Sequence, residues 1–402
     1  MIEQTDVFVI GGGPAGLAAA IAARRKGFRV VVADGGRWPI EKACGEGLMP
    51  DTVAALRELG ISVGAGDGQV MRGVRFVGSE SEVAARFPAE CAIGMRRMAL
   101  HTKMVEQAKS CGVEMLWGTP VAGISRDGVT LAVGRGKSGD GSEDRAGAAV
   151  DATDAGSRST RKNERAFVRA KWIVGSDGIG SRVRLWAGLD AATRRDCRYA
   201  VRRHYLVAPW SEFMEVHWGD RGQAYVTPVG AEEVCVVTIS RDRGAKSMAL
   251  EAEFPQLARR LGSAVVMGHE RGAITMTQKL RHVQRENVAL IGDASGSVDA
   301  ITGEGLALGF RQALALADAL ERGDLSRYEA AHRKLARRPA LMGRLMLVLD
   351  GRPRLRERTI RALASDADAR VFARLLAVHI GAKSEAHLAS IGAMLGWRLV
   401  GA

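Results

Sequence analysis

The chain of 402 residues is long enough for two or three domains with sizeable hydrophobic cores. Hydrophobic residues make up 47% of it, and no apolar run resembles a signal peptide or a membrane-spanning helix, so we expect a cytoplasmic protein. Five widely spaced cysteines without a CxxC pair argue against a disulfide framework and against a metal site.

The net charge of +13 is concentrated near the C-terminal end. Residues 331–361 contain ten Arg or Lys residues against two acids, a net charge of +8. A solvated basic surface is the simplest interpretation. The alternative is contact with an anionic membrane surface or an acidic partner, which would place the protein at the membrane periphery. No recognised nucleic-acid-binding module occurs, so we expect no nucleic acid partner.

The first 34 residues have the pattern of a βαβ unit. The apolar run 7–10 predicts a buried parallel strand, and an Ala-rich segment that ends near Lys26 predicts a helix. Residues 30–33 predict a second buried strand, which ends at Asp34. This order of elements is typical of the start of a nucleotide-binding domain.

Gly11, Gly13 and Gly16 lie between that strand and helix with the spacing G-x-G-x-x-G. Gly11 permits the tight turn, Gly13 lets the backbone approach a pyrophosphate, and Gly16 packs helix against strand. The free N–H groups of the helix N-terminus favour phosphate, and Asp34 can bind ribose hydroxyls. The sequence therefore predicts a dinucleotide site here.

The middle of the chain alternates between short helices and strands. A glycine-rich loop containing Cys44 precedes predicted helices over 51–59 and 96–111, a hairpin over 73–87, and strands over 113–117, 129–133 and 166–175. Residues 137–165 are rich in Gly, Ser, Asp and Arg without an apolar period, which predicts a mobile insertion. A second G-x-G-x-x-G at 134–139 precedes no helix and indicates only a polar loop.

A second sheet follows. Strand patterns over 199–207, 213–218, 224–229 and 234–239 are joined so closely that neighbouring strands must be antiparallel. Another buried strand over 287–291 leads into a Gly-Asp motif and a helix that ends near residue 320. From residue 326 onward the pattern is helical except for a break at 351–353.

Three glycine- and aspartate-containing motifs thus occur in fixed order, at 11–34, 175–184 and 292–305. In that order they resemble the flavoprotein monooxygenase superfamily typified by p-hydroxybenzoate hydroxylase. Cys44-Gly-Glu-Gly and Ile301-Thr-Gly-Glu-Gly are similar to motifs of its geranylgeranyl-reductase-like branch. The resemblance covers about residues 5–320 and implies non-covalently bound FAD.

The resemblance also implies roles for individual residues. Gly11, Gly13, Gly16 and Asp34 would hold the ADP half of FAD, and Arg97 would lie near its phosphates. Asp177 and Gly178 match a motif that serves both FAD and NAD(P)H, and Asp293 would bind a ribityl hydroxyl. Gly303, Glu304 and Gly305 would open a helix aimed at the flavin pyrimidine, where the helix dipole stabilises negative charge.

Cys44 and Tyr225 are the candidate catalytic residues. A lone cysteine is usually a small buried hydrophobe. The glycines around Cys44 favour close approach to a ligand, where it would line the active site or donate a proton. Tyr225 and Pro228 are what remains of the Tyr-x-Trp-x-Phe-Pro run that lines the cavity of isoprenoid reductases. The His and Pro of the hydroxylases correspond to Gly296 and Ala300. The absent His favours the reductase branch, whereas that branch keeps the Pro, so Ala300 departs from both.

The predicted fold class is α/β, with a Rossmann-type FAD-binding domain (1–72, 95–192 and 282–325), an antiparallel-sheet substrate domain (73–94 and 193–281) and a helical C-terminal region (326–402). The predicted function is that of an FAD-dependent oxidoreductase whose flavin is reduced by NAD(P)H without a second Rossmann domain. It would reduce a C=C bond of an isoprenoid-like or other hydrophobic small molecule. A monooxygenase acting through a C4a-hydroperoxide is the first alternative. A flavoprotein electron carrier docked through 331–361 is the second.

Overall fold

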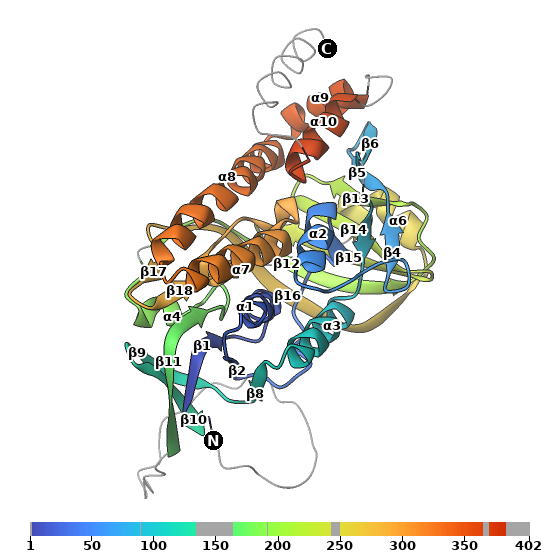
Figure 1. Ribbon diagram of the computed structural model, residues 1–402. Coiled ribbons are helices and arrows are strands. Elements are labelled where there is room, and N and C mark those ends of the chain that lie inside the picture. Colours follow the sequence, from blue (N-terminus) through green and yellow to red (C-terminus); the bar gives the residue numbers. More distant parts are fainter. Residues whose placement is uncertain are drawn as a thin grey trace, which may run out of the picture.

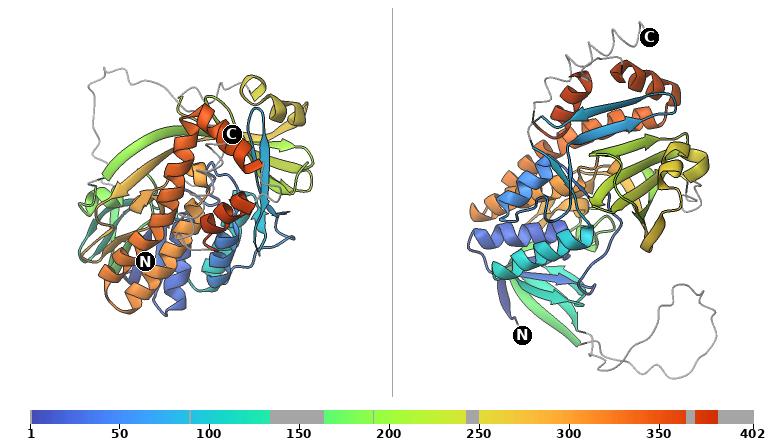
Figure 2. Two further views of the ribbon diagram at one scale, coloured as in Figure 1. Left: turned by 90° about the horizontal axis from the view of Figure 1, so that it is seen from above. Right: turned by 90° about the vertical axis from the view of Figure 1, so that its right-hand side faces the viewer.

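The structure is a computed structural model that describes residues 2–88, 90–133, 164–190, 192–242, 250–364 and 370–382 (Figure 1). The predicted insertion lies outside the described residues apart from its last two, and so does the second glycine pattern at 134–139. Two large sheets form the body of the molecule. Of the C-terminal helices, the first runs along the helices of the first sheet and the last two lie beside the second sheet (Figures 1 and 2).

The first sheet is mainly parallel, as predicted. Its order is β17 (Gln284–Arg285), β18 (Val288–Leu290), β11 (Glu164–Gly175), β1 (Gln4–Ile10), β2 (Val30–Asp34) and β8 (Glu114–Trp117). A hairpin of β9 (Val121–Ser125) and β10 (Gly128–Val133) adds to β11 in antiparallel fashion. Because the chain leaves β1 toward β2 on one side and β11 lies on the other, a crevice opens at the carboxyl ends of these strands.

Three helices cover one face of this sheet (Figure 1). They are α1 (Pro14–Arg25), α3 (Arg97–Ser110) and α7 (Gly305–Glu321), and α1 contacts both of the others. Small alanines along α1 let it approach the sheet closely, while Leu17 and Ile21 are fully buried in the shared core. The shorter α2 (Pro50–Glu58) packs against α7.

The second sheet has the order β19 (Gly296–Ser297), β16 (Val265–Leu280), β12 (Ala192–Leu206), β15 (Glu233–Ser240), β14 (Gly222–Gly230), β13 (Phe213–Trp218), β5 (Gly73–Val77) and β6 (Glu82–Arg86). Its pairs are antiparallel except β13 with β5. The four predicted strands are confirmed. The sequence missed β16 because most of its residues are exposed or half-buried, which leaves no apolar alternation to detect.

Smaller elements complete this region. A three-stranded sheet joins β3 (Gly47–Leu48), β7 (Ala92–Gly94) and β4 (Gln69–Met71). Short helices α4 (Arg182–Trp186), α5 (Leu250–Glu253) and α6 (Pro255–Leu261) lie outside the sheets.

The C-terminal region is helical in all its described parts, as predicted. It consists of α8 (Leu325–Asp350), α9 (Pro353–Ala364) and α10 (Arg370–His379), with the expected break between α8 and α9. The helices α9 and α10 pack against the β5–β6 hairpin (Figure 2). An apolar core between them and the second sheet includes Phe372 and Leu376 and extends to Ile301. The predicted fold class is confirmed, while the exact domain boundaries stay predictions.

Candidate functional site

The three sequence motifs meet at the carboxyl ends of neighbouring strands. The glycine turn follows β1, Asp177 follows β11, and Asp293 follows β18, and these strands are adjacent in the first sheet. Ser176, which the sequence analysis did not single out, joins two of the motifs because its N–H donates to Ile10 O (2.8 Å) and its hydroxyl lies 2.8 Å from Gly11 O. The crevice of the parallel sheet is therefore lined by all three motifs.

The three glycines of the turn meet different surroundings. Gly11 has φ +111°, and a Cβ there would lie 2.5 Å from Ser176 O. A Cβ on Gly16 would lie 1.9 Å from Gly11 O, so α1 can approach β1 only because this residue lacks a side chain. A Cβ on Gly13 would meet nothing within 4 Å. Gly11 and Gly16 therefore serve packing, whereas Gly13 faces open space.

Asp34 and His101 support this turn from outside. The Asp34 carboxylate accepts hydrogen bonds from the N–H groups of Gly12 and Gly36, each at 2.7 Å. The His101 ring on α3 lies 2.8 Å from Gly12 O, and burial lowers its pKa. A buried His on the apolar side of a helix gives no distinctive sequence signal, so this support was missed. The turn is thus fixed before any ligand binds.

Asp177 caps a helix. One of its carboxylate oxygens lies 2.5 Å from the Ser181 hydroxyl, and the other accepts from the N–H groups of Arg182 (2.7 Å) and Val183 (3.2 Å). Gly178 has φ +85°, and a Cβ on it would lie 3.4 Å from Lys42 Nζ. The predicted role of Asp177 in holding FAD and NAD(P)H stays a prediction, since its carboxylate already has three donors.

Arg97 lies close enough to Asp293 to act on its carboxyl. The Asp293 side chain is accessible, and desolvation raises the pKa of its carboxyl against the opposing effects of Lys42 and Arg97. Arg97 is buried at the start of α3, and its Nε has no hydrogen-bond partner among the described residues. Arg97 and Asp293 therefore offer a cation and an accessible acid to a ligand.

The segment before α7 has open backbone. Gly303 has φ +67°, and a Cβ on Gly303 or Gly305 would meet nothing within 4 Å. The Glu304 side chain lies buried with one carboxylate oxygen 3.3 Å from Arg338 and the other 3.5 Å from His379, and the predicted role of residues 303–305 at the cofactor stays a prediction. Burial raises the pKa of Glu304. At this position only the backbone faces the open space.

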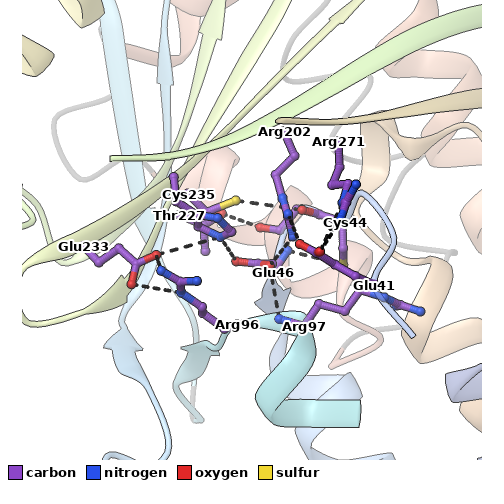
Figure 3. A network of polar contacts seen from close by, with 12 residues as sticks. Glu41, Cys44, Glu46, Arg96, Arg97, Arg202, Thr227, Glu233, Cys235 and Arg271 are labelled. Carbon is purple, nitrogen blue, oxygen red and sulfur yellow. Dashed lines mark hydrogen bonds and ion pairs between the residues drawn. The ribbon is translucent and has the colours of Figure 1, made fainter. Parts of the chain in front are cut away.

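The Cys44 loop is held from several sides (Figure 3). Cys44 Sγ accepts a hydrogen bond from Glu46 N (3.4 Å), and Gly45 O accepts one from the Thr227 hydroxyl (2.7 Å). The buried Glu46 carboxylate accepts from His204 (2.6 Å), Arg202 (3.2 Å) and the N–H of Arg97 (3.1 Å). The loop is thus anchored both to the second sheet and to the start of α3.

Cys235 adds a buried thiol behind this loop. Its Sγ lies 3.8 Å from Cys44 O, and burial raises its pKa. Donor atoms of Glu46, His204 and Cys235 lie within 4.8 Å of one another, a donor set that in other proteins binds metal ions. Here the carboxylate and the imidazole already bond to each other, and Arg202 supplies a cation, so the group is charge-balanced by protein atoms.

Tyr225 is buried in β14 and holds the segment before α7. Its hydroxyl donates to Ile301 O at 2.9 Å, and burial raises its pKa strongly. Arg198 and Asp299 form a fully buried ion pair beside it, and Asp299 Oδ1 accepts from Ile301 N (2.9 Å). Tyr225 therefore positions the backbone that leads to Gly303.

These features fit FAD. The open space at Gly13 suits a pyrophosphate, the unpartnered Arg97 Nε suits its charge, and the accessible Asp293 suits a sugar-like hydroxyl. The open backbone at Gly303 and Gly305 begins a helix of 17 residues, whose N-terminal dipole favours an electron-rich ring. The fold and the site together define a Rossmann-type flavoprotein.

Comparison with known proteins gives the family. A family model described as "FAD binding domain" matches residues 4–329, so the chain belongs to that family. It is similar to menaquinone reductase of Mycobacterium tuberculosis (strain ATCC 25618 / H37Rv), with 28% identity over 356 residues that cover 81% of this chain and 78% of that protein. It is also similar to digeranylgeranylglycerophospholipid reductase of Methanosarcina acetivorans, with 24% identity over 328 residues covering 76% and 72%.

Among solved structures, the crystal structure of a flavoprotein/dehydrogenase from Cytophaga hutchinsonii matches with a TM-score of 0.80. The identity is 15%, and the match covers 99% of this chain and 100% of that one, so this likeness shows the fold. The protein is an FAD-dependent oxidoreductase, and the predicted resemblance is confirmed.

Proposed function

We propose that the protein uses NAD(P)H to reduce its bound FAD and then reduces an apolar quinone or isoprenoid substrate. The observation that carries this proposal is the apolar core beside the Cys44 loop. Met49, Met71 and Met214 surround the site of a Cβ on Gly47 at 3.3, 3.7 and 3.5 Å. Methionine side chains are flexible and pack against irregular apolar groups, so this wall can adapt to a long hydrophobic chain. The two curated relatives, named as reductases of menaquinone and of a geranylgeranyl lipid, support the substrate class.

Different residues of the chain would bind different parts of the cofactor. Gly11, Gly13 and Asp34 shape the turn that receives the ADP half, and Arg97 and Asp293 receive the middle of the cofactor. Bound FAD supplies two-electron transfer as a hydride. The N-terminal end of α7 stabilises the negative charge of the reduced ring. The apolar core excludes water from the substrate side.

Cys44 is the proposed proton donor. Reduction of a quinone or of a C=C bond needs one hydride and one proton, and Cys44 is the proton-bearing side chain of the glycine-rich loop that borders the apolar core. The hydrogen bond from Glu46 N would stabilise its thiolate after the proton leaves. The alternative is that Cys44 only lines the substrate cavity. The Cys44 variants described in the Discussion distinguish these two roles.

An anaerobic assay tests the function. Purified protein should carry FAD released by denaturation, NADPH or NADH should bleach it, and added menadione should restore its colour without O₂. Oxidation of NAD(P)H that requires O₂ and yields an oxygenated product would establish a monooxygenase instead. Rapid electron transfer to a protein partner, with no small acceptor reduced, would establish an electron carrier.

We further propose that α8 docks on an anionic membrane surface. The +8 charge of 331–361 is partly neutralised, since Arg338, Arg356 and Arg361 all pair with acids. The exposed face nevertheless combines Lys334 and Arg344 with apolar side chains. Cations and apolar groups on one helix face are typical of interfacial binding. Substrates of the kind proposed reside in membranes, so docking would bring the enzyme to them.

The apolar part of that face consists of Leu345 and Val348, which are 46% and 43% exposed and lie three residues apart on α8. No helix in the described part of the chain is long and apolar enough to cross a membrane. L345D/V348D should abolish sedimentation with phosphatidylglycerol vesicles, while L206D, at a similarly exposed leucine on β12, should not. Equal binding to phosphatidylcholine vesicles, or no binding to either kind of vesicle, would contradict the proposal. The remaining interpretation of the basic surface would then be an acidic protein partner.

A further inference from the structure

Glu304 stands at the N-cap position of α7 but does not cap the helix. A carboxylate at this position is attracted by the free N–H groups of the first turn and by the positive end of the helix dipole. Within the described residues, the Glu304 side chain makes no capping hydrogen bond to α7. Its carboxylate lies instead 3.3 Å from Arg338 Nη2 of α8 and 3.5 Å from His379 Nδ1 of α10. Two C-terminal helices therefore hold a side chain that would otherwise be drawn to the start of α7.

The surroundings of this carboxylate explain why it stays there. Glu304 is only 3% exposed, and an ionised carboxylate at that depth is costly without a cation beside it. Burial raises the pKa of its carboxyl, and His379 and Arg338 both oppose that rise, which favours the ionised form. The His379 ring is fixed in place, because its Nε2–H donates to Thr302 O at 3.0 Å. A carboxylate that moved to cap α7 would give up both partners.

The N-terminus of α7 stays open as a result. The backbone before it is fixed, since the Tyr225 hydroxyl donates to Ile301 O at 2.9 Å. Gly305 begins the helix and is exposed, and a Cβ on it would meet nothing within 4 Å. A helix of 17 residues thus offers the free N–H groups of its first turn, and the positive end of its dipole, to a negative charge that is not part of the protein.

We propose that Arg338 and His379 are positioning residues that keep the Glu304 carboxylate away from the N-terminus of α7 and thereby raise the reduction potential of the flavin. This rests on the proposed function, in which that N-terminus stabilises the negative charge of the reduced ring. A carboxylate that capped α7 would occupy the N–H groups and would place a second negative charge beside the ring. Both effects would favour the oxidised flavin over the reduced flavin.

The alternative is that the two residues only stabilise the fold by neutralising a buried acid. Arg338 also lies 3.3 Å from Asp51 of α2, and Arg311 lies 3.7 Å from the same carboxylate oxygen. Arg311→Met is therefore the matched control, because it removes a cation from this cluster and leaves the partners of Glu304 in place. The two explanations differ in the reduction potential of the flavin, which a purely structural role would not change.

The test measures the midpoint reduction potential of the bound FAD by anaerobic titration in the presence of a reference dye. Arg338→Met should favour the oxidised flavin about tenfold, which for a two-electron couple lowers the potential by about 30 mV. His379→Gln can still donate to Thr302 O but no longer places a ring nitrogen beside Glu304, so it should shift the potential in the same direction. Arg311→Met should have the potential of the wild type.

Glu304→Gln separates the restraint of Glu304 from the charge of Arg338 itself. The amide carries no net charge, so in this background Arg338 has no carboxylate to hold. The double variant E304Q/R338M should therefore have the same potential as E304Q. It should also fold if R338M does not, because no unpaired buried carboxylate remains at this position. An equal fall in potential with and without the Glu304 carboxylate would show that Arg338 acts through its own charge, and would overturn the proposal.

Wild-type potentials in both R338M and H379Q would also overturn it, even if urea denaturation showed a loss of stability. The proposed function would survive that outcome, because FAD would still be bound and reduced by NAD(P)H. A wild-type protein that binds no FAD after reconstitution would instead reject the proposed function, and this inference with it.

Discussion

Two glycines of the first turn should respond in opposite ways to the same substitution. Gly13 has φ −71° and ψ 174°, which alanine adopts without strain, and its Cβ would meet no atom within 4 Å. Gly16 would place a Cβ 1.9 Å from Gly11 O and 2.5 Å from the Ser176 hydroxyl. We therefore expect Gly13→Ala to impair cofactor binding alone, and Gly16→Ala to impair the fold.

The magnitudes follow from these contacts. Overpacking by one methyl against bound pyrophosphate costs about 1–3 kcal/mol, which weakens FAD binding about 5- to 150-fold. The free energy of unfolding of Gly13→Ala without FAD should change by less than about 1 kcal/mol. Gly16→Ala cannot keep α1 in place, because the obstructing atoms are backbone. Its free energy of unfolding should fall by about 3 kcal/mol or more.

Fluorescence titration of the apoprotein with FAD and urea denaturation of the same samples measure both quantities. Gly27→Ala is a useful reference, because its Cβ also meets no atom within 4 Å but its φ of +88° imposes strain far from the turn. It should lose stability and retain FAD affinity. Wild-type affinity in Gly13→Ala would refute the placement of the pyrophosphate at this turn.

Three further predictions test the rest of the site. Tyr225→Phe should lower the free energy of unfolding by about 1–2 kcal/mol, seen by urea denaturation, because Ile301 O loses its donor; loss of turnover without loss of stability would instead make Tyr225 catalytic. In stopped-flow assays, Cys44→Ala should slow product formation about 10²–10⁴-fold, well beyond the effect of Cys44→Ser, and should leave flavin reduction unchanged. If both substitutions have equally small effects on product formation, Cys44 only lines the substrate cavity. Burial lowers the pKa of His332 from 6.5 to about 4, so the fold should lose up to about 3 kcal/mol as pH falls through this window. His332→Gln should show a flatter pH profile in urea denaturation, and equal pH profiles would contradict this.

Local patterns made the first sheet predictable. The glycine turn and the strands at 7–10 and 30–33 depend on short-range periodicity and on residues with few alternative roles. Both strands end within one residue of the predicted end, although β1 begins three residues earlier than predicted. The C-terminal helices were predictable for the same reason. In contrast β16 was missed, since a strand whose side chains are mostly exposed or half-buried lacks apolar alternation.

The candidate site was only partly predictable. Motif order indicated which backbone segments gather, and the structure brings them to adjacent strand ends. Side-chain partners are decided by long-range packing, which no local pattern encodes. The Glu304 side chain pairs with Arg338, which lies 34 residues further along, and the sequence motif gave no indication of this partner. The Glu46–His204 pair joins residues 158 apart, so neither residue stood out in the sequence.

The C-terminal helices belong to the site. An isolated buried charge is costly, so the buried acids around the start of α7 determine which cations must lie beside them. Glu304 and Asp51 both pair with Arg338 of α8, and the buried Arg198–Asp299 pair extends to Asp350 at the end of α8. Both clusters contact the segment that Tyr225 holds and that leads to the open backbone at Gly303 and Gly305. A shift of α8, such as the proposed docking on a membrane would impose, would therefore act on the backbone that is proposed to face the flavin. In this arrangement the surface proposed to meet the membrane and the site proposed to reduce its substrate share one set of buried ion pairs.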